Sequence, residues 1–285
     1  IQRLGSVAVG GNAGQVSQGT FSVAVGYAAG SQSQASGSIA VGYGAGQSGQ
    51  KSLAVAIGYQ AGNTVQGASA VAIGYQTGQS GQQSGSIAIG YQAGQTNIGT
   101  NSIAIGVQAG QTNQLSGAIA IGYQAGQTGH GTSAIAIGNQ AGQTGQGQNT
   151  VAIGINAGLL SQGSASISIG RSAGASAQGI NSIAIGSGAA QGTQGQNSIA
   201  IGTFAGATNQ GADCIAIGRF AGGTNQSANS VAIGLNSGFT GQGQNAIAIG
   251  QGAGQTNQGS GSICIGTSSG STFANTIVIN AQSAT

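Results

Sequence analysis

Residues 101–116 read NSIAIGVQAGQTNQLS, and close variants of this sixteen-residue unit fill the chain. Its motif, I/V-A-I/V-G, recurs every sixteen residues, and only the last rung, from Gly266 to Ile279, is fourteen residues long. A fixed period of this kind is typical of solenoids, in which each repeat forms one rung and stacks on the next. The sequence therefore predicts seventeen rungs, with motif glycines at Gly10, Gly26, Gly42, Gly58, Gly74, Gly90, Gly106, Gly122, Gly138, Gly154, Gly170, Gly186, Gly202, Gly218, Gly234, Gly250 and Gly266.

The columns of the repeat indicate short strands joined by glycine corners. Ile or Val stands three residues and one residue before each motif glycine, as at Ile103 and Ile105, with a small residue such as Ala104 between them. Apolar residues at i and i+2 follow the strand period, and β-branched side chains favour strands. We expect strands near 102–105 and 109–112, with the Ile columns inside and the Ala column on the opposite, outer side. The predicted fold class is an all-β parallel β-solenoid or β-roll.

Stacking accounts for the composition. Parallel rungs lie about 4.8 Å apart, so seventeen of them predict a rod roughly 80 Å long. Like residues then stack on each other, and Gln and Asn form amide ladders. Stacked like charges would repel, which fits a chain with only 2% charged residues. Gln stands eight residues after the motif glycine in fourteen of the seventeen rungs, and we expect it to bond turn backbone and its neighbours; the exceptions are Ile98, His130 and Ala274.

Composition also excludes several classes of protein. The chain contains 60 glycines and no proline, which does not fit collagen, and 39% hydrophobic residues with a net charge of +3 do not fit a disordered chain. Four basic residues are too few for a nucleic-acid surface, and no apolar run is long enough for membrane insertion. We expect one continuous repeat domain over residues 1–280 and a C-terminal tail or junction over residues 281–285.

The Ala column predicts an oligomer interface. A surface that is alanine at nearly every rung lets another backbone approach closely, so we interpret it as the seam of a homotrimer. The alternative is a monomeric solenoid whose Ala face meets solvent or its own second strand. The predicted seam comprises Ala88, Ala104, Ala120, Ala136, Ala152 and Cys264.

The residues offer no catalytic constellation. Asp213 is the only acidic side chain and His130 the only histidine, and they belong to distant rungs. Catalysis needs convergent acids, bases or nucleophiles, and a metal site needs several ligands. Cys214 and Cys264 lie about three rungs apart, which is too far for a disulfide. The sequence therefore predicts no enzyme, no metal and no cofactor.

Two columns offer candidate binding surfaces. The residue after the motif glycine is Tyr in six rungs, and this ladder either grips a glycan or flat surface or only stiffens the solenoid by stacking. A Thr column, six residues after the glycine and including Thr96, Thr112 and Thr128, raises ice binding as an alternative function. The candidate adhesion residues are Tyr27, Tyr43, Tyr59, Tyr75, Tyr91 and Tyr123.

The NSIAIG segments at 101–106, 181–186 and 197–202 give the rung a family resemblance. Together with the alanine three residues after the glycine, they resemble the head repeats of trimeric autotransporter adhesins, whose usual rung is two residues shorter. The resemblance implies a left-handed parallel β-roll, three chains side by side and an adhesive role. Similar rungs would also suit phage and virus fibres. We expect a structural or adhesive fibre or adhesin head, located outside the cell on a cell or virion surface, whose partners are its own copies and a host surface, matrix or glycan.

Overall fold

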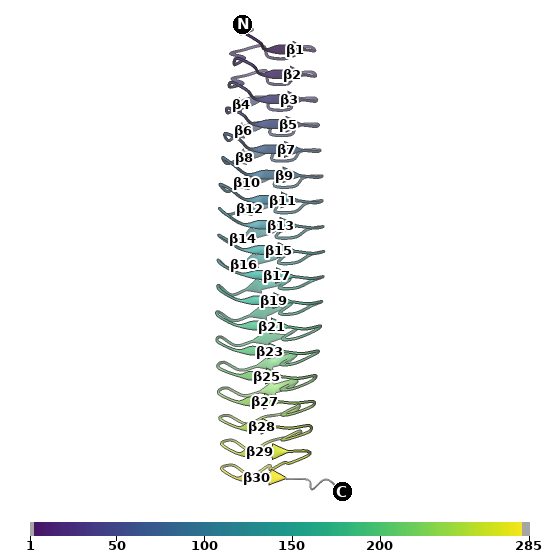
Figure 1. Ribbon diagram of the computed structural model, residues 1–285, viewed down its shortest axis with the longest axis vertical. Coiled ribbons are helices and arrows are strands. Elements are labelled where there is room, and N and C mark those ends of the chain that lie inside the picture. Colours follow the sequence, from purple (N-terminus) through teal and green to yellow (C-terminus); the bar gives the residue numbers. More distant parts are fainter. Residues whose placement is uncertain (1–2, 281–285) are drawn as a thin grey trace. The chain divides into compact units, whose positions relative to one another are not determined.

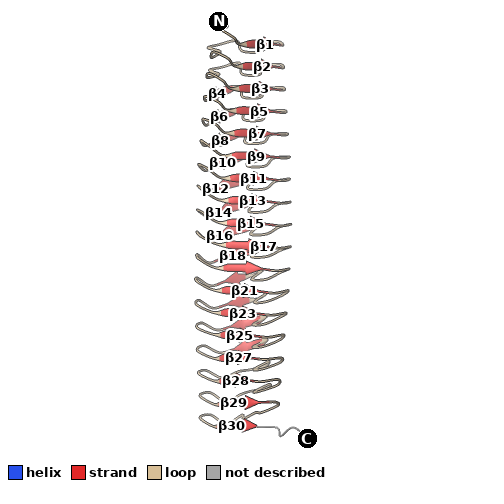
Figure 2. Ribbon diagram, in the orientation of Figure 1, coloured by secondary structure: helices blue, strands red, loops and turns tan. Residues whose placement is uncertain are grey.

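The structure is a computed structural model that describes residues 3–280, and the expected tail at 281–285 lies outside them. The chain forms two compact units, unit 1 over Ile1–Gly145 and unit 2 over Gln146–Thr285. Within each unit the chain winds through rungs of sixteen residues, each with a short strand on one side and, in most rungs, a second on the other (Figure 1). Strands and loops account for the described residues, without a helix (Figure 2). The fold class is confirmed: an all-β parallel solenoid of about seventeen turns.

The first strand of each rung carries the I/V-A-I/V motif, and these strands form what we call the Ile sheet of each unit. In unit 1 they are β1 (Val7–Val9), β2 (Val23–Val25), β3 (Ile39–Val41), β5 (Val55–Ile57), β7 (Val71–Ile73), β9 (Ile87–Ile89), β11 (Ile103–Ile105), β13 (Ile119–Ile121) and β15 (Ile135–Ile137). In unit 2 they are β17 (Val151–Ile153), β19 (Ile167–Ile169), β21 (Ile183–Ile185), β23 (Ile199–Ile201), β25 (Ile215–Ile217), β27 (Val231–Ile233), β28 (Ile247–Ile249), β29 (Ile263–Gly266) and β30 (Ile277–Asn280).

The second strands form the Gln sheet, named for the glutamine that ends most of them. In unit 1 they are β4 (Ser48–Gln50), β6 (Thr64–Gln66), β8 (Ser80–Gln82), β10 (Thr96–Ile98), β12 (Thr112–Gln114) and β14 (Thr128–His130), and β16 (Thr144–Gln146) falls at the division between the units. In unit 2 they are β18 (Leu160–Gln162), β20 (Ala177–Gln178), β22 (Thr193–Gln194), β24 (Thr208–Gln210) and β26 (Thr224–Gln226). The strand expected near 109–112 therefore begins at Thr112, because Ala109 and Gly110 belong to the turn before it.

Within each unit, paired residues of neighbouring strands are sixteen residues apart, which is the length of the repeat. Ile103 pairs with Ile119 in the Ile sheet, and Thr96 pairs with Thr112 in the Gln sheet, in parallel. In the last rung the shift is fourteen residues, because Ile263 pairs with Ile277. Each residue thus meets its counterpart one rung away, which confirms the predicted in-register stacking.

The motif glycine is required by this stacking. Gly106 has φ 129°, and a Cβ there would lie 2.6 Å from the carbonyl oxygen of Gly122. Both the positive φ and the close approach exclude a side chain. The glycine column therefore fixes the corner that follows each strand of the Ile sheet.

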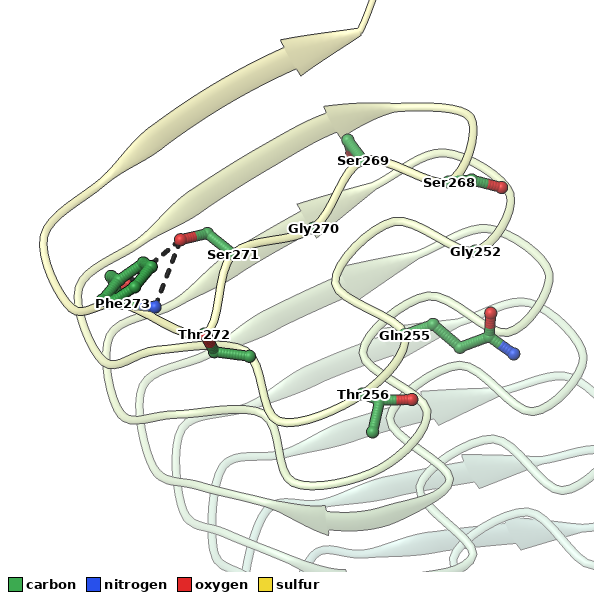
Figure 3. Close-up of a pocket in the computed structure, with 9 residues that line it drawn as sticks. All are labelled: Gly252, Gln255, Thr256, Ser268, Ser269, Gly270, Ser271, Thr272 and Phe273. Atoms are coloured by element: carbon green, nitrogen blue, oxygen red, sulfur yellow. Dashed lines mark hydrogen bonds between the residues drawn. The ribbon is translucent and has the colours of Figure 1, made fainter.

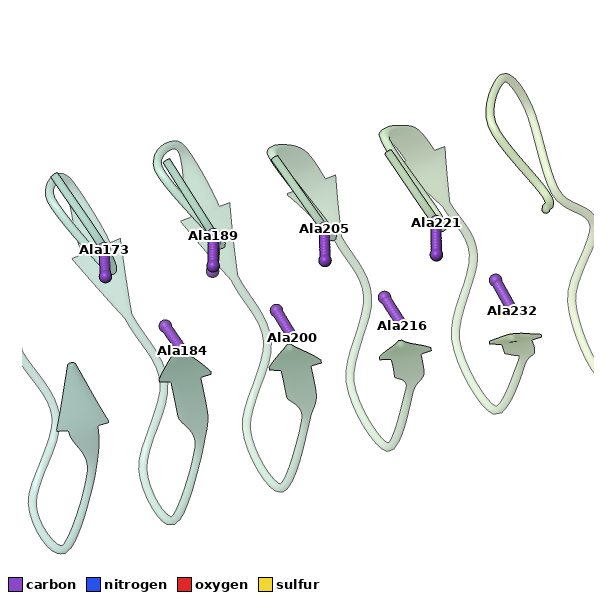
Figure 4. Close-up of a cluster of buried hydrophobic side chains, with 9 residues drawn as sticks. Ala173, Ala184, Ala189, Ala200, Ala205, Ala216, Ala221 and Ala232 are labelled. Carbon is purple, nitrogen blue, oxygen red and sulfur yellow. The ribbon is translucent and has the colours of Figure 1, made fainter. Parts of the chain in front are cut away.

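The interior is lined by alanine and glutamine, and the expectation that the Ile columns face inward is wrong. Ala104 is fully buried, whereas Ile105 is 36% exposed. Figure 4 shows the same arrangement in unit 2, where alanines such as Ala184 and Ala200 of the Ile sheet point toward Ala189 and Ala205 of the turns. Opposite the Ala column the interior is too narrow for larger side chains: a Cβ on Gly110 would lie only 3.2 Å from the Cβ of Ala104.

The predicted role of the Gln column is confirmed. Gln114 Nε2 donates hydrogen bonds to the carbonyl oxygens of Ile103, at 2.8 Å, and Ala118, at 2.9 Å, across the interior. Some consecutive glutamines also bond each other: Gln50 Nε2 donates to Gln66 Oε1 at 3.1 Å. These amides satisfy buried polar backbone groups, so the interior tolerates a polar side chain in every rung.

Candidate functional site

The outward side of the Ile sheet is an apolar surface, which we call the Ile face. It consists of the Ile and Val residues three positions and one position before each motif glycine. In unit 2, Ile153, Ile169, Ile201, Ile217 and Ile249 are each 37% exposed. Monomeric proteins rarely expose continuous apolar surfaces of this kind, and large ones mark interaction sites. Period-two reasoning found these residues but assigned them to the interior.

The residues predicted to form the trimer seam lie inside the chain. Ala88, Ala104, Ala120, Ala136, Ala152 and Cys264 have no exposed surface, so their side chains cannot meet a second chain. The strand alternation is as expected, but its two faces are exchanged, because the turn that faces this strand lies too close for a side chain larger than alanine. Any interface on this side of the solenoid involves the Ile face.

The tyrosine column of unit 1 forms a continuous stack. Neighbouring rings from Tyr27 to Tyr91 have centroids 5.1 to 5.3 Å apart and planes within 18° of parallel. Tyr123 is separated from this stack by Val107. These side chains are about half exposed. Because each ring covers the face of the next, the part that solvent reaches consists mainly of ring edges and hydroxyl groups. The stack can thus present a row of hydroxyls, rather than open ring faces, to a ligand.

Two outer amide ladders accompany the tyrosine column; ladders of stacked glutamine were expected, but these two columns were not singled out as part of the site. Gln76 Nε2 donates to Gln60 Oε1 at 3.1 Å, and Gln92 Nε2 donates to Gln76 Oε1 at the same distance. A parallel row repeats the pattern, with Gln95 Nε2 donating to Gln79 Oε1 at 3.2 Å. The signal was present, since glutamine recurs two and five residues after the motif glycine in unit 1. These ladders order the polar surface beside the tyrosines.

A polar pocket of about 420 Å³ lies at the last rungs of unit 2 (Figure 3). The fourteen-residue rung shortens the loop from Gly270 to Phe273, which borders it. Ser271 Oγ in this loop accepts a hydrogen bond from the backbone N–H of Phe273 at 3.2 Å. The other residues that line the pocket are uncharged: Gly252, Gln255, Thr256, Ser268, Ser269 and Thr272.

The threonine column repeats in register along the Gln sheet, as Thr112 pairs with Thr128. The outward residue that follows it in β10 and β12 is asparagine, so threonine fills one column rather than two. Ice binding therefore gains no specific support.

The titratable residues are scattered. In unit 2 the exposed Asp213 carboxylate accepts a hydrogen bond from Asn197 Nδ2 at 3.0 Å. His130 is buried in unit 1 at the end of β14. Both cysteines are free and buried, and burial raises the pKa of the Cys264 thiol. Across residues 3–280 no three potential metal ligands gather, and no helix has the length and hydropathy of a membrane span.

Comparison with known proteins agrees with the repeat chemistry. Residues 98–110 and 194–221 match the family described as the YadA head domain repeat, a surface-exposed structural adhesin domain. These segments include two of the three NSIAIG motifs and the strands β11, β23, β24 and β25. A search of curated proteins found no match. In rung chemistry and in fold, the chain is thus similar to the YadA-type head repeats of trimeric autotransporter adhesins.

Proposed function

We propose that the chain is the adhesive head or fibre segment of a surface structure outside the cell, and that copies of it assemble through the Ile face. The observation that carries this proposal is the Ile face itself, two columns of partly exposed Ile and Val that run through each unit. Covering this surface removes apolar area from water, which stabilises an assembly. Three copies turned toward a common axis would cover it, and the similarity to trimeric adhesins supports that number.

The solution mass, measured by light scattering over a range of dilutions, tests the assembly. Three times the chain mass of 26.8 kDa is expected. The test variant replaces three isoleucines of the Ile face by threonine, at Ile89, Ile105 and Ile121, and should reduce the mass toward one chain. The matched control replaces three threonines of the Gln sheet by serine, at Thr96, Thr112 and Thr128, and should keep the trimer. A wild-type mass of one chain at all concentrations would contradict the proposal.

Attachment is assigned to the tyrosine stack of unit 1. The row of hydroxyl groups beside ordered amides offers repeated donors and acceptors to a glycan or matrix surface. Replacing Tyr27, Tyr43, Tyr59, Tyr75 and Tyr91 by phenylalanine keeps the stack but removes the hydroxyls, whereas serine removes both. Binding to a glycan array and to immobilised matrix proteins should fall in both variants. Unchanged binding in the serine variant would exclude the stack.

A further inference from the structure

A small pocket in unit 2 lies where the repeat departs from its usual chemistry. It encloses about 150 Å³ and is lined by residues of the rungs that begin at Gly170, Gly186 and Gly202. The second strands of the first two of these rungs, β20 and β22, have two residues instead of three. The pocket is lined by Arg171, Ser172, Ser187, Gly188, Gln191 and Phe204.

The floor and one wall of the pocket depend on Gly188. A Cβ at this position would lie 2.5 Å from Cδ1 of Phe204, so the ring leans over the glycine. On its other side the ring stacks on Phe220, with the centroids 5.5 Å apart. Phe204 is thereby held between two neighbours and forms a fixed apolar wall.

The polar groups of the pocket are available to a ligand. Arg171 is exposed and forms no ion pair with any residue from 3 to 280, and the side chains of Ser172, Ser187 and Gln191 have no hydrogen-bond partner in that range. Arg219, in the same column, differs because its guanidinium carbon lies over the Phe220 ring at 5.7 Å. The pocket thus combines one free cation, two hydroxyls, an amide and an aromatic wall.

We propose that this pocket binds a carboxylated sugar, such as a uronic acid unit of an acidic polysaccharide. A guanidinium can hold a carboxylate through two parallel hydrogen bonds. The two serine hydroxyls and the Gln191 amide supply donors and acceptors for sugar hydroxyls. The two faces of the Phe204 ring are covered by Gly188 and Phe220, so its edge offers apolar surface to the carbons of the sugar ring. The pocket is complete within one chain, so the inference does not depend on the Ile face or on the tyrosine stack.

Calorimetric titration of the full chain with a glucuronate-containing oligosaccharide tests the inference, with a glucose oligosaccharide of equal length as the neutral comparison. Arg171→Gln should weaken binding of the acidic sugar roughly tenfold or more, since it removes hydrogen bonds to a charged group. Gly188→Asn should do the same, because its Cβ would push the Phe204 ring out of place, while asparagine tolerates the positive φ there. Arg219→Gln is the matched control, with the same loss of charge outside the pocket, and should bind like the wild type. Circular dichroism checks that each variant is folded.

Three results would overturn the inference. Equal weakening by Arg171→Gln and Arg219→Gln would indicate general electrostatic attraction. Displacement of the sugar by acetate at equal concentration would indicate an anion site without sugar recognition. Absence of binding, or equal binding of the neutral oligosaccharide, would exclude a carboxylated sugar as the ligand.

Discussion

Replacing Ala104 by valine should destabilise unit 1 more than any conservative change on the Ile face nearby. Ala104 is fully buried. The space opposite it is so narrow that a Cβ on Gly110 would lie 3.2 Å from the Cβ of Ala104. Valine adds two methyl groups to this interior, and overpacking of this kind typically costs about 1–3 kcal/mol. The matched change, Ile105→Val, removes one methyl group from a side chain that is 36% exposed. Since Ile→Val costs about 0.5–1.5 kcal/mol in a full core, we expect about 0.5 kcal/mol or less there.

The assay is urea denaturation combined with amide hydrogen exchange. Long repeat arrays do not always unfold in one step, so exchange reports the local effect. The N–H of Gly106 donates to Ile89 O and that of Gly122 to Ile105 O, each at 2.9 Å. Ala104→Val should lower the protection of both amides roughly five- to hundredfold, which corresponds to about 1–3 kcal/mol. If Ile105→Val proves more destabilising than Ala104→Val, the isoleucines fill the interior and the reasoning is refuted.

Three further changes test other parts of the structure. Val65 has φ 52°, which is strained for a β-branched residue, so Val65→Asn should stabilise unit 1 by about 1–2 kcal/mol and raise the urea midpoint; a lower midpoint would contradict this. Ile98 interrupts the interior glutamines, and Gln114 Oε1 in the next rung is buried without a partner. Ile98→Gln would place an amide donor beside this oxygen, as in the pair of Gln50 and Gln66, and should stabilise unit 1 by about 1 kcal/mol; a lower urea midpoint would contradict this. Burial raises the pKa of Cys264 above its ordinary 9.0, so the unfolded chain loses this proton first and stability should fall as pH rises above about 9. At pH 8 this thiol should react with an aromatic disulfide reagent far more slowly in the folded chain than in urea, and equal rates would show that it is accessible.

The period, the register and the role of the glutamines could be predicted because they depend on spacing alone. Which face of each strand points into the interior could not be predicted. A period of two shows that Ile103 and Ile105 share a face and that Ala104 occupies the other, but it does not show which face lies inside. The cue was the second small column, at Ala109 and Gly110, which indicates two closely approaching layers.

The candidate sites depended on side-chain geometry to a greater degree. The tyrosine column was visible as a column, but only the ring distances show that the faces are covered by neighbouring rings. The pocket beside Arg171 combines residues from three rungs. In the sequence it is marked only by Gly188, which stands where many other rungs have glutamine. Departures of this kind cannot be interpreted until the surrounding side chains have been placed.

The strict register has a consequence for how such a chain can change during evolution. Any sixteen consecutive residues contain one complete set of columns, wherever the stretch begins. A duplication or deletion of the DNA that encodes such a stretch therefore adds or removes one whole rung and leaves every neighbouring pair matched. Loss of a single codon inside a rung would instead shift alanines, glycines and glutamines out of their columns. The length of such a chain can therefore change by whole rungs through recombination between its own repeats, without disturbing the columns that hold each rung to the next.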